Sequence, residues 1–208
     1  MPSVKASPSI RTEQAAQTRR RILEAAVRVL EAHGFAGTRI DDVATEARVA
    51  VPTVYKAFTN KVNLLIGAVN QTMAGHDAAP IDQQAWFTEQ LDEPDPMRQL
   101  QLIARNARRM YERAGQLLNV LRAAAPLNPD LAQAWHDIAA QRLDRSHRTA
   151  KSLATKAPDR LRLSRDDTAL TLLALSEPEL FTTYTTGHRT PDQYEAWLAD
   201  ILCRSLLH

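Results

Sequence analysis

Hydroxyl-bearing and cationic side chains lie together on one side of the short stretch 51–58, VPTVYKAF. At helical spacing, Thr53, Tyr55 and Lys56 point outward, while Val54 and Phe58 point toward a core. Residues in the first turn of such a helix can reach base edges when the helix lies in the major groove of DNA. The first chemistry that these residues suggest is therefore nucleic-acid recognition.

The usual patterns of catalytic and metal-binding sites are missing from the sequence. It has no glycine-rich phosphate loop, no G-x-S-x-G nucleophile turn and no H-E-x-x-H zinc motif. His136 and His147 share a face of one expected helix, but at about 1.5 Å per residue they lie about 16 Å apart, too far for one metal ion. We expect no enzymatic activity, no cofactor and no metal site.

Two short helices joined by a tight turn, over residues 38–61, would position the outward side chains. Thr38 is the expected N-cap of the first helix. The turn falls at residues 47–49, and Pro52 lies in the first turn of the second helix, where a missing N–H costs nothing. Asn60 is the expected cap of the helix that follows. This arrangement is typical of a helix-turn-helix.

The block from Thr18 to Leu65 resembles the DNA-binding domain of the TetR (tetracycline repressor-like) family of bacterial transcriptional regulators. The resemblance is most specific at the tail T-x-Y-x-x-F-x-x-K, formed by Thr53, Tyr55, Phe58 and Lys61. It implies an all-α fold, with an N-terminal three-helix helix-turn-helix DNA-binding domain and a C-terminal helical domain for ligand binding and dimerisation. The sequence departs from the family pattern at Arg48, where glycine is common, and at Ala50, where a serine cap is common.

The resemblance also implies which side chains contact DNA. Thr38, Tyr55 and Lys61 match the family's phosphate-positioning groups, and Arg39, Arg48 and Lys56 are expected to contact the backbone or the bases. Thr53 and the small surface of Val51 and Pro52 would approach the bases. Because Val51 and Pro52 lack side-chain donors, readout should depend on apolar contact with thymine methyl groups and on flanking Arg or Lys.

Composition and charge fit a globular protein with a basic end. The chain has 208 residues, of which 44% are hydrophobic and 24% charged, and no apolar run is long enough to cross a membrane. Residues 1–61 hold ten Lys and Arg against six acidic residues, although the whole chain carries only +2. No secretory signal is expected at the N-terminus, and a single cysteine, Cys203, fits a reducing cytoplasm. We read Cys203 as a packed apolar side chain and not as a redox group.

Glycine and proline residues and changes in the apolar pattern divide the chain into three regions. Residues 1–11 form an expected disordered arm, 12–75 the DNA-binding domain, and 76–208 a helical regulatory and dimerisation domain. Within these, helices are expected at 14–33, 61–74, 83–91, 96–115, 117–126, 129–157, 164–174, 178–187 and 190–207. Gly115 is read as a helix stop, and no strand pattern is found.

The C-terminal region offers aromatic and apolar side chains that could line an effector pocket, with a few polar groups to anchor a ligand. These are Trp86, Phe87, Met110, Tyr111, Leu121, Trp135, Phe181 and Tyr184, with Arg105, Arg109 and His136 as polar anchors. Periodicity does not separate a pocket wall from a filled core, so core packing is the alternative for each. The composition of the set favours a hydrophobic or aromatic effector.

The last helix has apolar residues on two adjoining edges, which is wider than one buried stripe requires. In proteins of the TetR family the last two long helices pair with their copies, so we expect residues 164–207 to form a homodimer interface. The residues expected there are Tyr194, Trp197, Leu198, Ile201 and Leu202. The alternative is that this face packs within its own subunit.

Together these features predict a homodimeric regulator, most simply a repressor, that binds a palindromic site on double-stranded DNA and is released by a small effector. The alternative is a ligand-binding dimer that acts by sequestration or protein contact without a discrete operator. A membrane partner is not expected.

Overall fold

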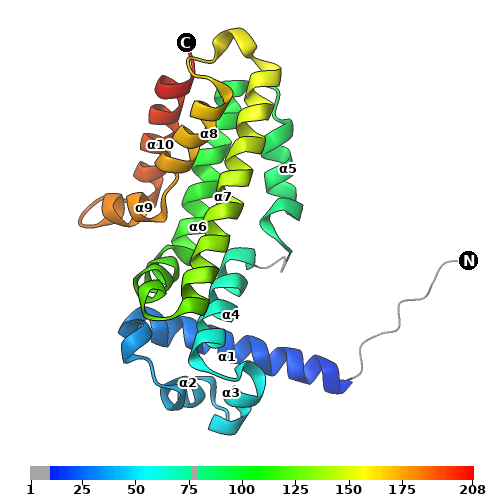
Figure 1. Ribbon diagram of the computed structural model, residues 1–208, viewed down its shortest axis with the longest axis vertical. Coiled ribbons are helices and arrows are strands. Elements are labelled where there is room, and N and C mark those ends of the chain that lie inside the picture. The colour runs from blue at the N-terminus through cyan, green and yellow to red at the C-terminus, as the bar shows by residue number, and fades with distance from the viewer. Residues whose placement is uncertain (1–9, 76–78) are drawn as a thin grey trace, which may run out of the picture. The chain divides into compact units, whose positions relative to one another are not determined.

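In the computed structural model, residues 10–75 and 79–208 are described, and they are helical almost throughout (Figure 1). These residues contain no β-strand, but Leu161 and Leu207 form an isolated antiparallel β-bridge. The all-α fold expected from the sequence is therefore confirmed. The chain divides into two compact units, residues 1–69 and 70–208.

The N-terminal unit contains α1 (Ile10–Gly37), α2 (Ile40–Ala47), α3 (Val51–Phe58) and the first part of α4 (Lys61–Ala74). Apolar residues from all four helices form its core: Ile22, Ala26, Leu30, Val43, Val54, Phe58, Leu64 and Leu65 are each less than 5% exposed. Asn60 caps α4 through a bond from the Asn63 N–H to its Oδ1 at 2.8 Å, as expected.

One expectation about α1 needs correction. Residues 1–9 of the expected arm lie outside the described residues, but residues 10 and 11 already belong to the helix. At the other end, the helix breaks after residue 33 as expected, because Gly34 has φ +65°, a conformation that favours glycine; a further short helical stretch then runs to Gly37.

Thr38 is not the N-cap of α2. The N-cap position is Arg39, which has no side-chain capping bond. Thr38 is 2% exposed, and its hydroxyl donates to the Gly34 carbonyl at 2.7 Å. It therefore ties the connection between α1 and α2 back onto the end of α1.

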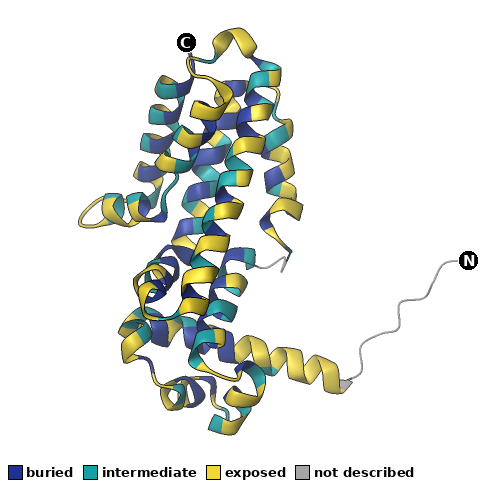
Figure 2. Cartoon of the chain, viewed as in Figure 1, coloured by how far each residue is buried: buried dark blue, intermediate teal, exposed yellow. Residues whose placement is uncertain are grey.

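The C-terminal unit begins within α4 and continues through η2 (Ile81–Gln83), α5 (Ala85–Asp92), α6 (Pro96–Ala124), η3 (Ala125–Leu127), α7 (Pro129–Lys156), η4 (Pro158–Arg160), α8 (Arg165–Leu175), α9 (Pro178–Thr185) and α10 (Pro191–Leu206). The long helices α6 and α7 run through the unit, with α8 packed on α7 and α10 packed on α6 (Figure 1). Their buried sides face one another and their exposed sides face outward (Figure 2).

Capping residues define the starts of α7, α8 and α10, close to the expected helix starts at 129, 164 and 190. Asn128 accepts from the N–H groups of Asp130 and Leu131 at the start of α7, and Ser164 caps α8. Thr190 and Gln193 form a complete capping box at the start of α10.

The expected helix stop at Gly115 is wrong, because α6 runs without interruption from Pro96 to Ala124. Gly115 is buried in the middle of this helix, and a Cβ placed there would lie 3.6 Å from the Phe181 ring. That distance leaves room for a methyl group but not for a large side chain beside α9. No helix within residues 10–75 and 79–208 is long and apolar enough to cross a membrane.

Candidate DNA-binding surface and effector cavity

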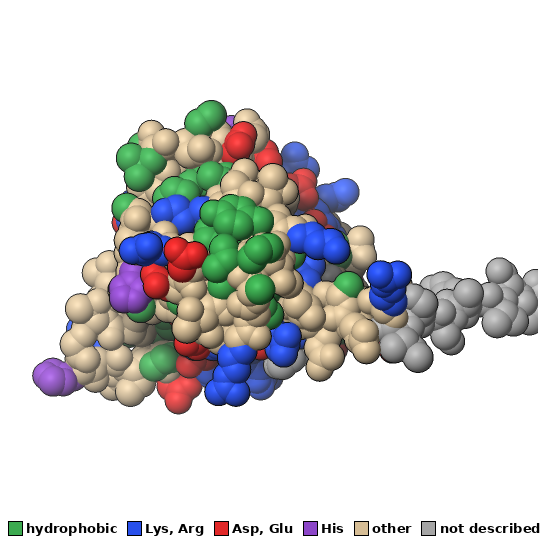
Figure 3. Space-filling view, turned by 90° about the horizontal axis from the view of Figure 1, so that it is seen from below, with side chains coloured by type: hydrophobic (Ala, Val, Ile, Leu, Met, Phe, Trp, Pro, Cys, Tyr) green, Lys and Arg blue, Asp and Glu red, His purple; other side chains and the backbone are tan. Residues whose placement is uncertain are grey.

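Helix α3 presents one face to the core of the N-terminal unit and another to solvent. Val54 and Phe58 are 1% and 4% exposed and hold the inner face, whereas Tyr55 is 50% exposed and Pro52 and Lys56 are also exposed. Val51 and Thr53 are half-buried beside them. The face of the molecule drawn in Figure 3 carries Lys and Arg side chains around exposed apolar ones.

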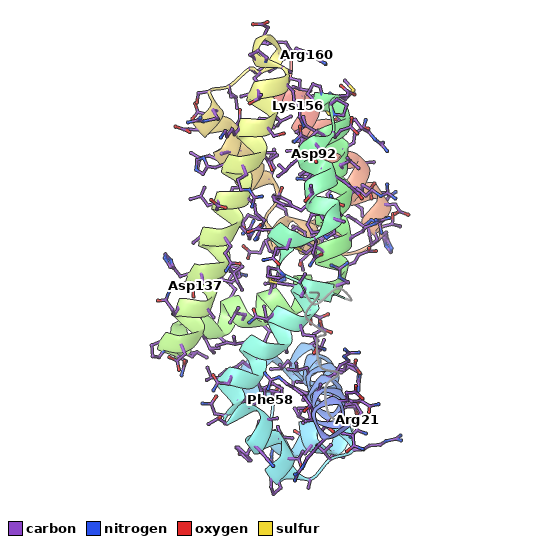
Figure 4. The ribbon with its side chains drawn as sticks, turned by 90° about the vertical axis from the view of Figure 1, so that its right-hand side faces the viewer. Arg21, Phe58, Asp92, Asp137, Lys156 and Arg160 are labelled. Atoms are coloured by element: carbon purple, nitrogen blue, oxygen red, sulfur yellow. The ribbon has the colours of Figure 1, made fainter. Side chains whose placement is uncertain are left out.

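Arg19 anchors the last turn of α3. Its Nη1 donates to the Ala57 carbonyl at 2.6 Å, and its guanidinium lies 4.0 Å from the centre of the Phe58 ring. Figure 4 labels Phe58 in the N-terminal unit, and its ring also packs against Gly67 of α4. A cation at the end of a helix stabilises the exposed carbonyls of its last turn. Arg19 therefore positions α3 from α1.

Lys61 is engaged within the N-terminal unit in a similar way. Its Nζ donates to the carbonyls of Phe35 at 2.8 Å and Thr38 at 3.0 Å, and lies 4.5 Å from the centre of the Phe35 ring. The resemblance assigned Thr38 and Lys61 to phosphate contacts, but their side-chain donors bond to backbone carbonyls of the unit. In the structure both side chains tie parts of the helix-turn-helix together.

Two of the other expected cations remain exposed near the turn. Arg48 has φ 53° and ψ 51°, so a non-glycine residue occupies the left-handed conformation where glycine is common in the family. Arg39 lies 3.5 Å from Asp41 in an exposed pair. Arg28 and Glu46 join α1 to α2 at 2.6 Å. The structure thus leaves Arg39, Arg48 and Lys56 available to an anionic partner.

The C-terminal unit contains a cavity of about 90 Å³ between α5, α6, α7 and α8. Most of its wall is apolar, and the polar part comes chiefly from α7. The lining residues are Ile81, Trp86, Phe87, Gln90, Ile103, Ala107, Met110, Tyr111, Arg142, Arg145, Ser146, Thr149, Leu172, Leu173 and Ser176. Four expected pocket residues, Trp86, Phe87, Met110 and Tyr111, are among them.

The other expected pocket residues lie elsewhere. Leu121 is fully buried, Trp135 is half-buried and His136 is exposed. Arg105 and Arg109 lie in a surface hollow between α6 and α10. Phe181 packs edge-on against Tyr194 at 5.1 Å between ring centres, and Tyr184 stacks on Trp197 at 4.9 Å. These aromatic residues fill the contact between α9 and α10, so they are not part of this cavity.

Arg142 is a buried cation whose charge is balanced. Its Nη1 lies 2.9 Å from the Glu177 carboxylate, and its Nη2 donates to the Ser176 carbonyl at 2.9 Å. Burial alone would lower the pKa of the Arg142 guanidinium, but Tyr111 and Glu177 raise it overall. The Tyr111 hydroxyl also donates to the Ser176 carbonyl, and burial raises the pKa of Tyr111.

Arg145, one turn further along α7, is less well balanced. Its side chain is 11% exposed, and its Nη1 lies 3.8 Å from the Asp82 carboxylate. Its Nη2 is buried and has no hydrogen-bond partner in residues 10–75 and 79–208. Burial lowers the pKa of the Arg145 guanidinium.

Sequence reasoning missed both arginines, although a signal was present. Arg142 and Arg145 continue the inward stripe of α7 that contains Ile138, Thr149 and Leu153. An arginine in an otherwise apolar stripe either pairs inside the protein or binds a ligand.

Three of the five residues expected at the dimer interface are buried inside the subunit. Tyr194, Leu198 and Leu202 are each 0% exposed, and they lie on the side of α10 that packs on α6. This part of the expectation is wrong, because one of the two apolar edges of α10 serves the subunit's own core. Trp197 and Ile201 remain half-buried, and Leu170 on α8 is 53% exposed.

Lys156 closes the far end of the C-terminal unit. Its ammonium donates to the carbonyl of Glu93 at 2.6 Å and to that of Leu91, beside Asp92 (Figure 4). Burial lowers the pKa of Lys156. This contact fixes the end of α7 against the loop between α5 and α6, far along α7 from the cavity residues Arg142 and Arg145.

Comparison with known proteins agrees with this architecture. A model of the tetR family of bacterial regulatory proteins matches residues 22–68. The chain is 35% identical over 79 residues to the HTH-type transcriptional repressor SCO4008 of Streptomyces coelicolor, an alignment that covers 36% of this chain. It spans 41% of the length of that curated relative.

Solved structures extend the similarity to nearly the whole chain. NalD of Pseudomonas aeruginosa, described as the secondary repressor of the MexAB-OprM multidrug efflux pump, superposes with a TM-score of 0.71 at 23% identity, covering 94% of this chain and 98% of that one. FadR of Bacillus subtilis, solved in complex with stearoyl-CoA, gives 0.71 at 18% identity, covering 91% and 99%. At these identities the structures show a shared fold.

Proposed function

We propose that this chain is a DNA-binding transcriptional regulator of the TetR family that acts as a repressor, because its residues 22–68 match the model of that family. We assign DNA binding to residues 12–75 and regulation and dimerisation to 76–208. The observation that carries the proposal is the two-sided packing of α3: Val54 and Phe58 are buried, while Pro52, Tyr55 and Lys56 are exposed.

The chemistry of this face suits duplex DNA. Lys56 and Tyr55 offer a charge and a hydroxyl to phosphates, and Arg39 and Arg48 flank the helix with two further exposed cations. Val51 and Pro52 at the start of α3 offer apolar surface to thymine methyl groups. Arg19 and Lys61 bond to backbone carbonyls of the unit, which fixes the angle at which α3 is presented.

We propose a homodimer formed by α8 and α10. In this arrangement the outward residues Leu170, Trp197 and Ile201 meet their copies. Two copies of α3 would then enter successive major grooves of a palindromic site, about 34–36 Å apart. Sedimentation of the wild type and of Leu170→Asp tests this part: the substitution should shift the protein toward monomer, and a wild-type monomer at micromolar concentration contradicts it.

We propose that the cavity between α5, α6, α7 and α8 holds a small effector whose binding releases the protein from DNA. Its largely apolar wall supports a ligand with a hydrophobic body.

Selection from random DNA duplexes tests the central claim. The wild type should enrich a palindrome, and Lys56→Ala should enrich the same site more weakly, because a phosphate contact carries little sequence information. Lys151→Ala, which removes an exposed lysine of α7, is the matched control and should behave as the wild type. If the wild type enriches no palindrome, the proposal fails, and a ligand-binding dimer without a discrete operator becomes the better reading.

A further inference from the structure

We infer that the effector of the cavity is a small monocarboxylate with an apolar body, held through its carboxylate by Arg145. The inference rests on the proposed effector role of the cavity, and it adds the chemical class of the ligand.

The first support is the charge balance around α7. Arg145 and Arg148 share a single carboxylate, with Asp82 Oδ1 3.8 Å from one and 3.6 Å from the other. Arg148 is 42% exposed, so water can solvate its charge, whereas Arg145 is 11% exposed. Asp82 and, at longer range, Asp144 attract Arg145, but neither provides a close acceptor for its buried Nη2, which lies in the cavity wall.

The second support is the difference between the two cavity arginines. Arg142 bonds to the Glu177 carboxylate and to the Ser176 carbonyl at the end of α8, so it already has two close acceptors. The Nη2 of Arg145 is buried and, in the described part of the chain, bonds to nothing. A buried guanidinium donor left unpaired is costly, and an anionic acceptor would remove that cost.

The third support is size and shape, which favour a carboxylate over a phosphate ester. The guanidinium plane matches a carboxylate in a two-bond arrangement. At about 90 Å³ the cavity is smaller than the roughly 150 Å³ that holds benzene, so it accepts a small headgroup and a short body. Met110 lies in the wall, and its flexible side chain is the one best able to make room for a larger body.

The test is calorimetric titration of the full chain, without DNA, using matched acids and amides: butyrate, hexanoate and benzoate against butyramide, hexanamide and benzamide. For at least one pair, the wild type should bind the acid about tenfold or more tightly than the amide, because a charge-assisted bond replaces a neutral one. Arg145→Gln should bring that ratio close to one. Arg148→Gln, which removes a neighbouring charge and leaves Asp82 to Arg145, should lower the ratio less than Arg145→Gln does.

Asp82→Asn provides a variant with the opposite expected effect. Removing the competing carboxylate should raise the acid-over-amide ratio above that of the wild type, and this result does not depend on Arg145→Gln folding. The inference is overturned if no acid binds, if acid and amide bind equally to the wild type, or if Arg145→Gln folds and retains the preference.

Separate DNA-binding measurements keep the two proposals distinguishable. A protein that binds the acid through Arg145 but selects no operator refutes the regulator role and leaves the ligand class standing. A protein that selects an operator but binds none of the acids refutes the ligand class alone.

Discussion

Replacing Lys61 by methionine separates a positioning role from a phosphate contact. Methionine keeps most of the aliphatic stem and removes the ammonium that bonds to the carbonyls of Phe35 and Thr38. Thr38 is 2% exposed, so its carbonyl loses a partner in a place that water reaches poorly. An unsatisfied buried carbonyl costs about 1–3 kcal/mol, and the half-buried Phe35 adds less, so we expect a loss of about 2–3 kcal/mol. For a chain of this size, that loss lowers the Tm by about 4–12 °C.

The assay combines thermal unfolding with the salt dependence of DNA affinity. Lys61→Met should lower the Tm and weaken binding, but the slope of log affinity against log salt should stay that of the wild type, because no phosphate contact is lost. Lys56→Ala is the control with the opposite pattern. It should leave the Tm within about 1 °C, since exposed surface substitutions change stability little. Its salt slope should become shallower by about 1.8, which is 0.9 for each copy in the dimer.

An unchanged Tm of Lys61→Met, together with a salt slope that is shallower by the same amount as in Lys56→Ala, would refute the positioning role of Lys61. That outcome would return Lys61 to the phosphate-contacting role that the sequence resemblance suggests.

Two further predictions concern the C-terminal unit. Gly115→Ala should raise the Tm, because an alanine Cβ fits at 3.5–3.6 Å from Tyr111 and Phe181 and improves helix propensity by up to about 1 kcal/mol. Gly115→Leu should lower the free energy of unfolding by about 1–3 kcal/mol, because its side chain overpacks against α9. Thermal unfolding of both variants checks this, and a destabilised alanine variant contradicts it. Burial raises the pKa of the Cys203 thiol above its usual 9.0, so less thiolate is present at pH 8. Alkylation by iodoacetamide should therefore be slower than in the urea-unfolded chain, and the alkylation rate should rise with pH around a midpoint above 9.0. A midpoint at or below 9.0 counts against the burial of this thiol.

Capping residues predicted the starts of helices well, because a cap acts on N–H groups only a few residues away. Asn128, Ser164 and Thr190 begin helices in the structure because their side chains reach N–H groups two or three residues ahead. Gly115 misled the prediction because glycine has two uses, as a helix end and as a place of close approach. The ring of Phe181, 66 residues further along the chain, decides between them.

The sites were harder to predict because their residues are defined by partners that are distant in sequence. Lys61 and Thr38 were assigned from a motif, but the motif does not show that carbonyls at residues 34, 35 and 38 occupy their donors. Arginine is mostly exposed in proteins, so the sequence favours a surface position for Arg142 and Arg145. Their burial follows from the packing of α8 against α7.

Amphipathic periodicity showed that α10 has two apolar edges but not which edge faces inward. Tyr194, Leu198 and Leu202 fit against α6, and this leaves Trp197 and Ile201 nearer the surface. An apolar edge that faces the subunit's own core and one that faces a partner have the same periodicity in sequence, so only the position of the neighbouring helix distinguishes them.

At position 48, in the turn between α2 and α3, the residue that best fits the backbone differs from the residue that would best attract DNA. Glycine or asparagine at position 48 would relieve the left-handed backbone of Arg48, but either would also delete a cation next to the proposed DNA-facing helix. A library at this single codon, sorted once for thermal tolerance and once for operator occupancy, should therefore return different winners. We expect arginine to be recovered in the sort for occupancy and glycine or asparagine in the sort for thermal tolerance.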